Sequence, residues 1–174
     1  IKATVPSCPP LLDIEIDMHR RGIGEEDAFR RLARRFTWNP LRVQRAWERA
    51  HEVDATYRSL TVREQITYPE ALARLYPLEW SAPERPPAPA ALTIAVVGHP
   101  YCLYDEYINH NLVTRLRGLG VRVLASEMVS DAEAQLGIQC TTGQTRWFYE
   151  KWVSGAAGHF LTLPGLDGLI AVLA

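Results

Sequence analysis

The chain has 174 residues, 47% hydrophobic and 22% charged, so it can build the core of one ordinary domain with a small attachment and is not a disordered polymer. Its net charge of −1 gives no general electrostatic reason to expect nucleic acid or an anionic membrane as a partner. No apolar run approaches the roughly 20 residues of a membrane-spanning helix and no signal peptide is visible, so we expect a soluble, cytoplasmic protein.

The three cysteines are far apart in the sequence. Cys8, Cys102 and Cys140 form no CxxC pair, and none has a histidine at zinc-finger spacing. We therefore expect ordinary thiols. An iron–sulfur cluster usually takes four thiolates, so a cluster held by this chain would need a further ligand from elsewhere.

Residues 1–80 are predicted to be a mainly helical portion. The opening is rich in proline and indicates an extended surface segment that ends in a short alternating stretch over 12–17. A first helix is expected to begin at the acidic residues 25–27. Its apolar face is predicted to consist of Ala28, Phe29, Leu32, Ala33 and Phe36.

Two more helices are expected before residue 80. The second has Asn39 as its N-cap and Pro40 in its first turn, and the third covers residues 68–76 with Pro69 in its first turn. The 13 basic and 12 acidic residues of this portion balance, which favours solvated helix faces over a phosphate-binding surface. The buried stripe of the second helix is predicted to be Val43, Ala46, Trp47, Ala50, Val53 and Tyr57.

A stiff, extended linker is predicted over residues 81–90, "SAPERPPAPA", which contain four prolines. Residues 91–174 then alternate between strand and helix patterns. Strands are expected over 92–98, 121–128 and 166–174, and long helices over 106–120 and 146–163. The first half of 129–145 is expected to be a short helix, and Gly118 or Gly120 to end the helix before it.

This alternation predicts a three-stranded parallel sheet with right-handed crossovers and strand order 2-1-3, an α/β half-domain of the Rossmann or flavodoxin type. The sequence begins at Ile1 without a methionine and stops inside the apolar run "LIAVLA". We therefore expect the chain to be a fragment of a larger protein.

The loop after the first strand is the predicted site. In the order 2-1-3 it lies at the topological switch point, where parallel sheets bind ligands. The loop reads "GHPYCLYDEYINHN" and has neither GxGxxG nor a P-loop motif. The candidate cleft or ligand-binding residues are Gly98, His99, Pro100, Tyr101, Tyr104, Asp105, Tyr107, Asn109, Asn111 and, from the end of the second strand, Glu127.

Each candidate has both a chemical and a structural interpretation. His99 has the pKa range of an acid or base, and Pro100 biases it to an extended backbone. Gly98 leaves room for a ligand or for a neighbouring backbone. Asp105 could orient an imidazole or cap the next helix. The tyrosines could donate hydrogen bonds to a carbonyl or carboxylate, or pack with their hydroxyls at the rim.

Two further chemistries are disfavoured. Cys102 as a nucleophile would need a base and a thiolate-stabilising environment, and a buried thiol is the simpler interpretation. His99, Asp105 and His110 have no recognised metal-ligand spacing, so no metal site is predicted.

A family resemblance rests on the stretch "AVVGHPYCLYDEYINHNLVTRLRGLGVRVLASEM". Its strand, Gly-His-Pro-Tyr-x-Leu-Tyr-Asp loop, helix and Gly-Val-x-Val strand resemble the 2-hydroxyacyl-CoA dehydratase superfamily. More narrowly, the stretch is similar to the activase-associated branch, a CoA enzyme activase domain of unknown function. The segments "IKATVPSCPPLLDIEID", "WFYEKWVSGAAGHFL" and "LDGLIAVLA" are also similar to that branch.

The resemblance implies a cofactor and a partner for the longer protein. Members carry a single or double cubane iron–sulfur cluster in a cleft between Rossmann-like domains. An ATPase of the BadF/BadG type delivers a low-potential electron to it, and dehydratase members act on 2-hydroxyacyl-CoA. The family's cysteine turns lie outside this chain and the branch tends to have asparagine at Cys102, so no cofactor ligand is assigned here.

Two functions follow as hypotheses. The first is a fragment of an ATP-dependent, activase-coupled iron–sulfur reductase or dehydratase-like component, inactive alone and self-associating through unpaired sheet edges. The alternative is a non-catalytic α/β module that binds a ligand or a partner protein, because related folds host unrelated functions.

Overall fold

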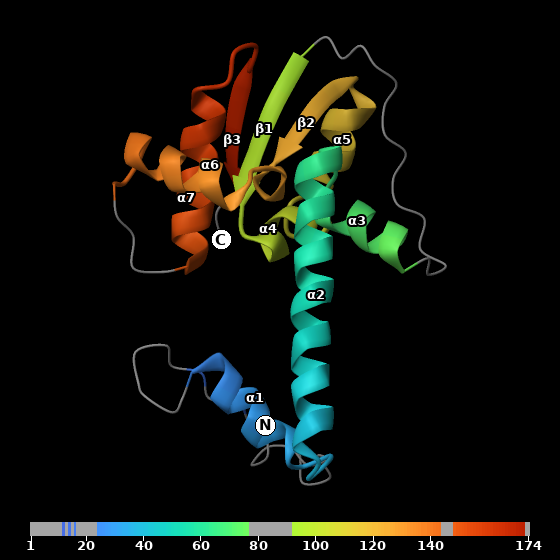
Figure 1. Ribbon diagram of the computed structural model, residues 1–174. Helices are drawn as coiled ribbons and strands as arrows, with labels where there is room; N and C mark the ends of the chain where they lie inside the picture. The colour runs from blue at the N-terminus through green and yellow to red at the C-terminus, as the bar shows by residue number, and fades with distance from the viewer. Residues whose placement is uncertain are drawn as a thin grey trace, which may run out of the picture. The chain divides into compact units, whose positions relative to one another are not determined.

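A computed structural model describes residues 12, 14, 16, 24–76, 92–143 and 148–172 (Figure 1). It divides into two compact units between Ala55 and Thr56. Most of the extended N-terminal stretch and the whole linker 81–90 lie outside the described residues, and the domain boundaries at 80 and 91 stay predictions. No helix in the described ranges is long and apolar enough to cross a membrane.

The described part of unit one contains α1 (Glu25–Ala33) and the first part of α2 (Pro40–Glu64). Asn39 caps α2 as predicted, since its Oδ1 accepts hydrogen bonds from the backbone N–H groups of Leu41, at 3.0 Å, and Arg42, at 3.3 Å. On α1, Ala28 is buried. The Phe29 ring lies 5.6 Å from the Trp47 ring.

The buried stripe predicted for α2 is wrong over this part of the helix. Ala46 and Ala50 are exposed, Val43, Trp47 and Val53 are only half-buried, and the buried side chains of α2 are Leu60 and Thr61, near its end. The pattern is amphipathic, but amphipathicity alone does not supply the surface against which a stripe is buried.

Unit two begins with the end of α2 and with α3 (Tyr68–Leu75). Leu60, Ile66 and Ala71 form a small core between these two helices. The main part of the unit is a parallel sheet of β1 (Leu92–Gly98), β2 (Val121–Ala125) and β3 (Gly168–Val172) in the order β2-β1-β3. Thr93 pairs with Arg122, and Ile94 with Gly168. The predicted parallel sheet and its order are therefore confirmed.

Helices cover both faces of the sheet, because successive side chains of β1 point to opposite sides. Ala95 and Val97 pack with Ala156 and Phe160 of α7 (Phe148–Leu161) in the larger core, which α6 (Asp131–Gly137) also joins. On the other face Val96 packs in a second core with partly buried residues of α5 (Leu112–Gly118) (Figure 1).

The long helix predicted over 106–120 is wrong. A short helix, α4 (Pro100–Tyr104), comes directly after β1, and α5 begins only at Leu112. Between them His110 and Asn111 have φ angles of 53° and 58°, in the left-handed region, which no continuous helix of L-residues tolerates. Gly118 ends α5, and Gly120 takes the positive φ of the turn before β2.

Candidate functional site

The C-terminal ends of β1 and β2 meet at one edge of the sheet, and both predicted site segments leave from there. The backbone N–H of Gly98 donates to Ser126 Oγ at 3.3 Å, which joins the two segments. A Cβ atom on Gly98 would lie 2.5 Å from the carbonyl oxygen of Val172. The space beside Gly98 is therefore filled by the backbone of β3. Of the two explanations for this glycine, room for a neighbouring backbone applies, and room for a ligand does not.

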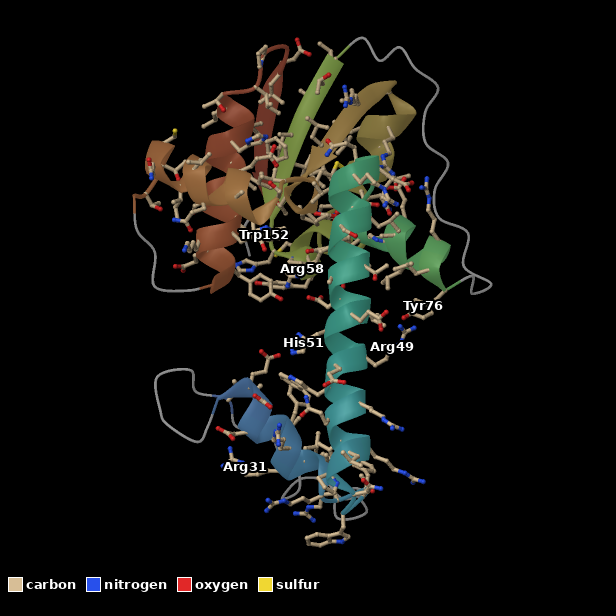
Figure 2. All side chains as sticks on the ribbon, viewed as in Figure 1. Arg31, Arg49, His51, Arg58, Tyr76 and Trp152 are labelled. Atoms are coloured by element: carbon tan, nitrogen blue, oxygen red, sulfur yellow. The ribbon has the colours of Figure 1, made fainter. Side chains whose placement is uncertain are left out.

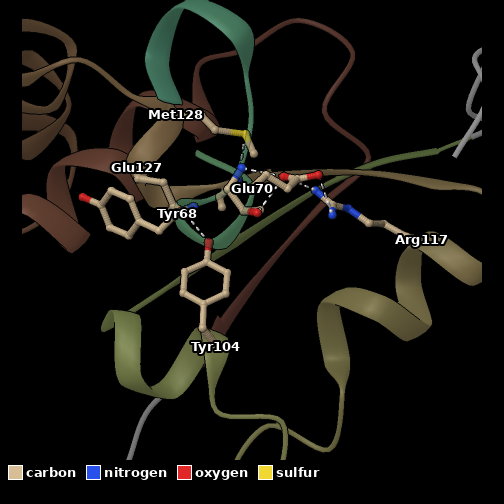
Figure 3. A network of polar contacts seen from close by, with 8 residues as sticks. Tyr68, Glu70, Tyr104, Arg117, Glu127 and Met128 are labelled. Atoms are coloured by element: carbon tan, nitrogen blue, oxygen red, sulfur yellow. Dashed lines mark hydrogen bonds and ion pairs between the residues drawn. The ribbon is translucent and has the colours of Figure 1, made fainter. Parts of the chain in front are cut away.

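Glu127 lies at the centre of the polar network at this edge (Figure 3). It belongs to the 3-10 turn Ser126–Met128 that follows β2, and it is 2% exposed. Its Oε1 accepts hydrogen bonds from the hydroxyl of Tyr104 and from the backbone N–H of Tyr68, at 2.9 Å from the latter. Its Oε2 is buried without a hydrogen-bond partner among the described residues.

The end of α2 fixes the turn that carries Glu127. Thr61 Oγ1 donates to the carbonyl of Glu127 at 2.9 Å, and Gln65 Nε2 donates to the carbonyl of Met128 at 3.0 Å. The carbonyl groups of Glu127 and Met128 are thus satisfied by side chains far away in the sequence. The position of Glu127 therefore depends on the packing of α2.

The surroundings of Glu127 favour its neutral form. Burial raises the pKa of the Glu127 carboxyl, while the hydrogen bonds from Tyr104 and Tyr68 act in the opposite direction and only partly offset it. Burial, followed by the negative charge of Glu127, raises the pKa of Tyr104 well above its ordinary value. A carboxyl with a raised pKa beside a phenol takes up a proton more readily than a free carboxyl does.

A second buried carboxyl has the opposite environment. Both oxygens of Glu70 accept hydrogen bonds from the Arg117 guanidinium at 3.1 Å, and the two side chains are each 8% exposed. Glu70 Oε2 also accepts from the backbone N–H and hydroxyl of Thr67, at 2.7 and 2.6 Å. Burial by itself would raise the pKa of Glu70, but these hydrogen bonds outweigh burial and hold the pKa below its ordinary value. Its negative charge in turn raises the pKa of Glu127.

Glu127 and Tyr68 line a pocket of about 320 Å³ within unit two. The Tyr68 ring is stacked on Tyr57 at 5.0 Å and lies 6.2 Å from the Trp152 ring at an interplanar angle of 21°. Trp152 and Arg58, labelled in Figure 2, also line the pocket. Its volume is at the lower end of the range for small-molecule sites, and it combines aromatic rings with a carboxyl and an arginine.

The other loop candidates fall into two groups. The backbone of His99 is extended as predicted, with φ −66° and ψ 145°, directly before Pro100. Its ring stacks on Tyr101 at 5.5 Å and lies 5.7 Å from Tyr149 of α7. Tyr107 is 91% exposed.

The second group makes local hydrogen bonds. Asp105 Oδ1 accepts from the backbone N–H groups of Tyr107 and Ile108, each at 3.0 Å. Asn109 Nδ2 donates to the carbonyl of Leu103 at 2.6 Å, and the backbone N–H of Asn111 donates to the carbonyl of Glu106 at 3.1 Å. Asp105 therefore caps a turn, and no hydrogen bond joins it to His99 in the part of the chain that the structure describes.

The described residues do not fit an iron–sulfur cluster or another metal centre. Within them no group of three or more His, Cys, Asp or Glu side chains can hold a metal ion. Cys102 is buried and Cys140 is exposed, and Cys8 lies outside the described residues.

Sequence reasoning missed Tyr68, Glu70 and Arg117, all of which belong to the network. One local signal was present: Thr67 followed three residues later by Glu70 is the pattern of a capping box, and it marks Glu70 as a side chain turned back toward the start of α3. Nothing near Arg117 or Tyr68 in the sequence indicates their partners, which lie 47 and 59 residues away.

Comparison with known proteins gives one match. The family model described as CoA enzyme activase uncharacterised domain (DUF2229) matches residues 1–129, which is about three quarters of the chain and includes the loop after β1 and Glu127. No curated protein and no solved structure matches the chain.

Proposed function

Because the chain belongs to the CoA enzyme activase uncharacterised domain family, we propose that it is part of an ATP-dependent, activase-coupled iron–sulfur reductase or 2-hydroxyacyl-CoA dehydratase-like component. The observation that carries the proposal is the placement of Tyr104 and Glu127 at the C-terminal edge of the sheet, where the hydroxyl of the partly buried Tyr104 donates to the buried Glu127 carboxyl. The family match supports the association with an activase, and the edge is where parallel sheets bind ligands.

In this proposal the edge borders the cleft in which the reaction takes place. Removal of water from a 2-hydroxyacyl thioester needs a proton for the leaving hydroxyl group, and a neutral carboxyl is a suitable donor. Glu127 lines the pocket of about 320 Å³ and is held in place by Tyr68 and Thr61. Its role would be to hold a proton beside the substrate.

The iron–sulfur cluster of the proposal does not belong to the described residues, since they offer no set of ligands for it. Its ligands would come from other segments of a longer protein. When bound, the cluster would supply electrons, and an ATPase of the BadF/BadG type would be the electron donor. The roles given above to Glu127, Tyr68 and Thr61 do not depend on the cluster.

The test uses the full-length protein produced without oxygen. We expect bound iron and acid-labile sulfide, and an ATP-dependent reduction of the protein by the purified ATPase. The Glu127→Gln variant should keep its iron and its reduction but lose turnover of 2-hydroxyacyl-CoA. A wild-type protein without iron would refute the proposal, and unchanged turnover in the variant would refute the role of Glu127.

A non-catalytic binding module is the second candidate. It is favoured by the loop itself, in which Asp105 and Asn109 are occupied with capping backbone groups and are not directed at a common ligand. The parent gene separates the two candidates: cysteine-bearing turns on both sides of this chain favour the iron–sulfur component, and their absence favours the module.

A further inference from the structure

Positive charge is concentrated in one short part of unit one. Residues 30–49 contain seven basic and one acidic side chain, and the remainder of the chain contains twelve basic and nineteen acidic ones. The near-equal numbers of basic and acidic residues over residues 1–80 therefore conceal this basic segment. The chain thus has one strongly basic segment within an otherwise acidic protein.

The connection between α1 and α2 and the first turn of α2 also expose large apolar side chains. Phe36 is 72% exposed, Trp38 85% and Leu41 68%. They are held on a defined turn, because the backbone N–H of Asn39 donates to Thr37 Oγ1 at 3.2 Å and Asn39 caps α2. We call residues 34–45 the basic–apolar turn.

The arginines of the basic–apolar turn are available for a partner. Arg34, Arg35, Arg42 and Arg45 are exposed, and none makes an ion pair with another described residue, in contrast to Arg30, which pairs with Glu26 at 2.6 Å. Aromatic residues and arginine, side by side and exposed, are the composition of interaction hot spots.

A surface of complementary chemistry lies in unit two. Residues 101–108 expose Tyr101, Tyr107 and Ile108 together with the carboxylates of Asp105 and Glu106. No lysine or arginine occurs between residues 99 and 114. Asp105 fixes the shape of this acidic loop through its hydrogen bonds to the following backbone.

We propose that the basic–apolar turn of one copy binds the acidic loop, residues 101–108, of a second copy. The charges are opposite and both surfaces have exposed aromatic rings, so the contact combines attraction with apolar burial. A bilayer or a nucleic acid fits less well, because the remainder of the chain has seven more acidic than basic residues and repels a polyanion.

This contact joins two different surfaces and is therefore heterologous, so that copies associate head to tail. The proposed contact uses the same loop that the proposed function places beside the reaction cleft. Its test, however, measures association between copies and requires neither enzymatic activity nor an iron–sulfur cluster. Failure of one proposal can therefore be distinguished from failure of the other.

The test is a complementation of two variants of the whole chain, followed by light scattering at low and high salt. Arg34→Glu/Arg35→Glu removes the turn, and Glu106→Ala/Tyr107→Ala removes the loop without reversing its charge. Each variant alone should associate about a hundredfold more weakly than wild type, because a like-charge contact or the loss of an aromatic anchor removes most of the attraction. An equimolar mixture should form one-to-one dimers and nothing larger, because each variant keeps one intact surface and the two altered surfaces do not attract each other.

Arg122→Glu, which reverses an exposed arginine on β2, is the matched control and should assemble as wild type does. Circular dichroism checks that every variant is folded. A mixture that stays monomeric overturns the proposal, as does a wild-type chain that is monomeric at all concentrations in low salt. Binding of the turn to phosphatidylglycerol vesicles or to a single-stranded oligonucleotide, without association between copies, would also overturn it.

Discussion

Replacement of Arg117 by methionine tests how α3 is held to α5. Its guanidinium and Glu70 form a bidentate pair between α5 and α3, with both side chains 8% exposed. Without Arg117, Glu70 keeps only the two hydrogen bonds from Thr67. Removal of one partner from a buried pair costs about 3–5 kcal/mol, out of the roughly 5–15 kcal/mol by which a domain is stable.

The double variant Glu70→Gln/Arg117→Met is the informative comparison. Glutamine keeps an oxygen that can accept from Thr67, and no charge is left buried, so the loss of stability should fall to about 1–2 kcal/mol. The double variant is thus expected to be more stable than Arg117→Met alone. If the double variant is the more stable of the two, the cost of Arg117→Met comes from leaving the Glu70 charge buried without its partner. If it is not, the cost comes from lost packing.

The assay is urea unfolding at neutral pH, followed by circular dichroism. Since the pKa of Glu70 is lowered in the folded protein, the pair stabilises wild type above the ordinary carboxyl pKa of 4.5. That contribution is lost as the pH falls through the lower, folded value. The difference between wild type and Arg117→Met should therefore shrink in acid. Single and double effects that add to within about 0.5 kcal/mol would refute the reasoning.

Three further predictions concern Glu127 and the contact between α6 and α7. Because the pKa of Glu127 is raised, wild-type stability falls as the pH rises from 4.5 through the folded value. The stability gained by Glu127→Gln should therefore grow over that window, by about 1.4 kcal/mol per unit of the pKa difference; a pH-independent difference in urea unfolding would contradict this. Tyr104→Phe removes a hydrogen bond that lowers the pKa of Glu127, so the carboxyl should titrate higher by carbon NMR and the protein lose about 1–3 kcal/mol. Gly158→Ala should cost several kcal/mol in thermal unfolding, since its Cβ would overlap the Gly137 carbonyl, whereas Gly118→Ala meets nothing within 4 Å and should gain about 0.5–1 kcal/mol.

The sheet could be predicted because its signals are local and repeated. The apolar run of β1 and the alternation of strands with helices determine a parallel sheet, and the order 2-1-3 places the site edge after β1. The helix over 106–120 could not be predicted from its apolar spacing. Asp105 and Asn109 bind nearby backbone groups, and this competes with helix formation in a way that periodicity does not register.

The composition of the site was predictable only in part, for a physical reason. Tyr104 and Glu127 both follow strands of the sheet, so the topology brings them to one edge. Tyr68 reaches the network from α3 and Arg117 from α5, and their contacts depend on three-dimensional fit between segments many residues apart. Chemistry at strand ends can be inferred from a single sequence, whereas the groups that set its pKa cannot.

The opposite environments of the two buried carboxyls bear on what Glu127 is for. Glu70 is paired, capped and favoured as an anion, which is what a structural carboxyl requires. Glu127 has a raised pKa and one oxygen without a hydrogen-bond partner among the described residues, so it costs stability that an apolar side chain of similar volume would not cost. A group that is unfavourable for folding, located at the edge where parallel sheets bind ligands, has the properties of a functional residue. If the proposed function holds, the stability gained by Glu127→Gln and the turnover lost in the same variant are therefore two measurements of one cause.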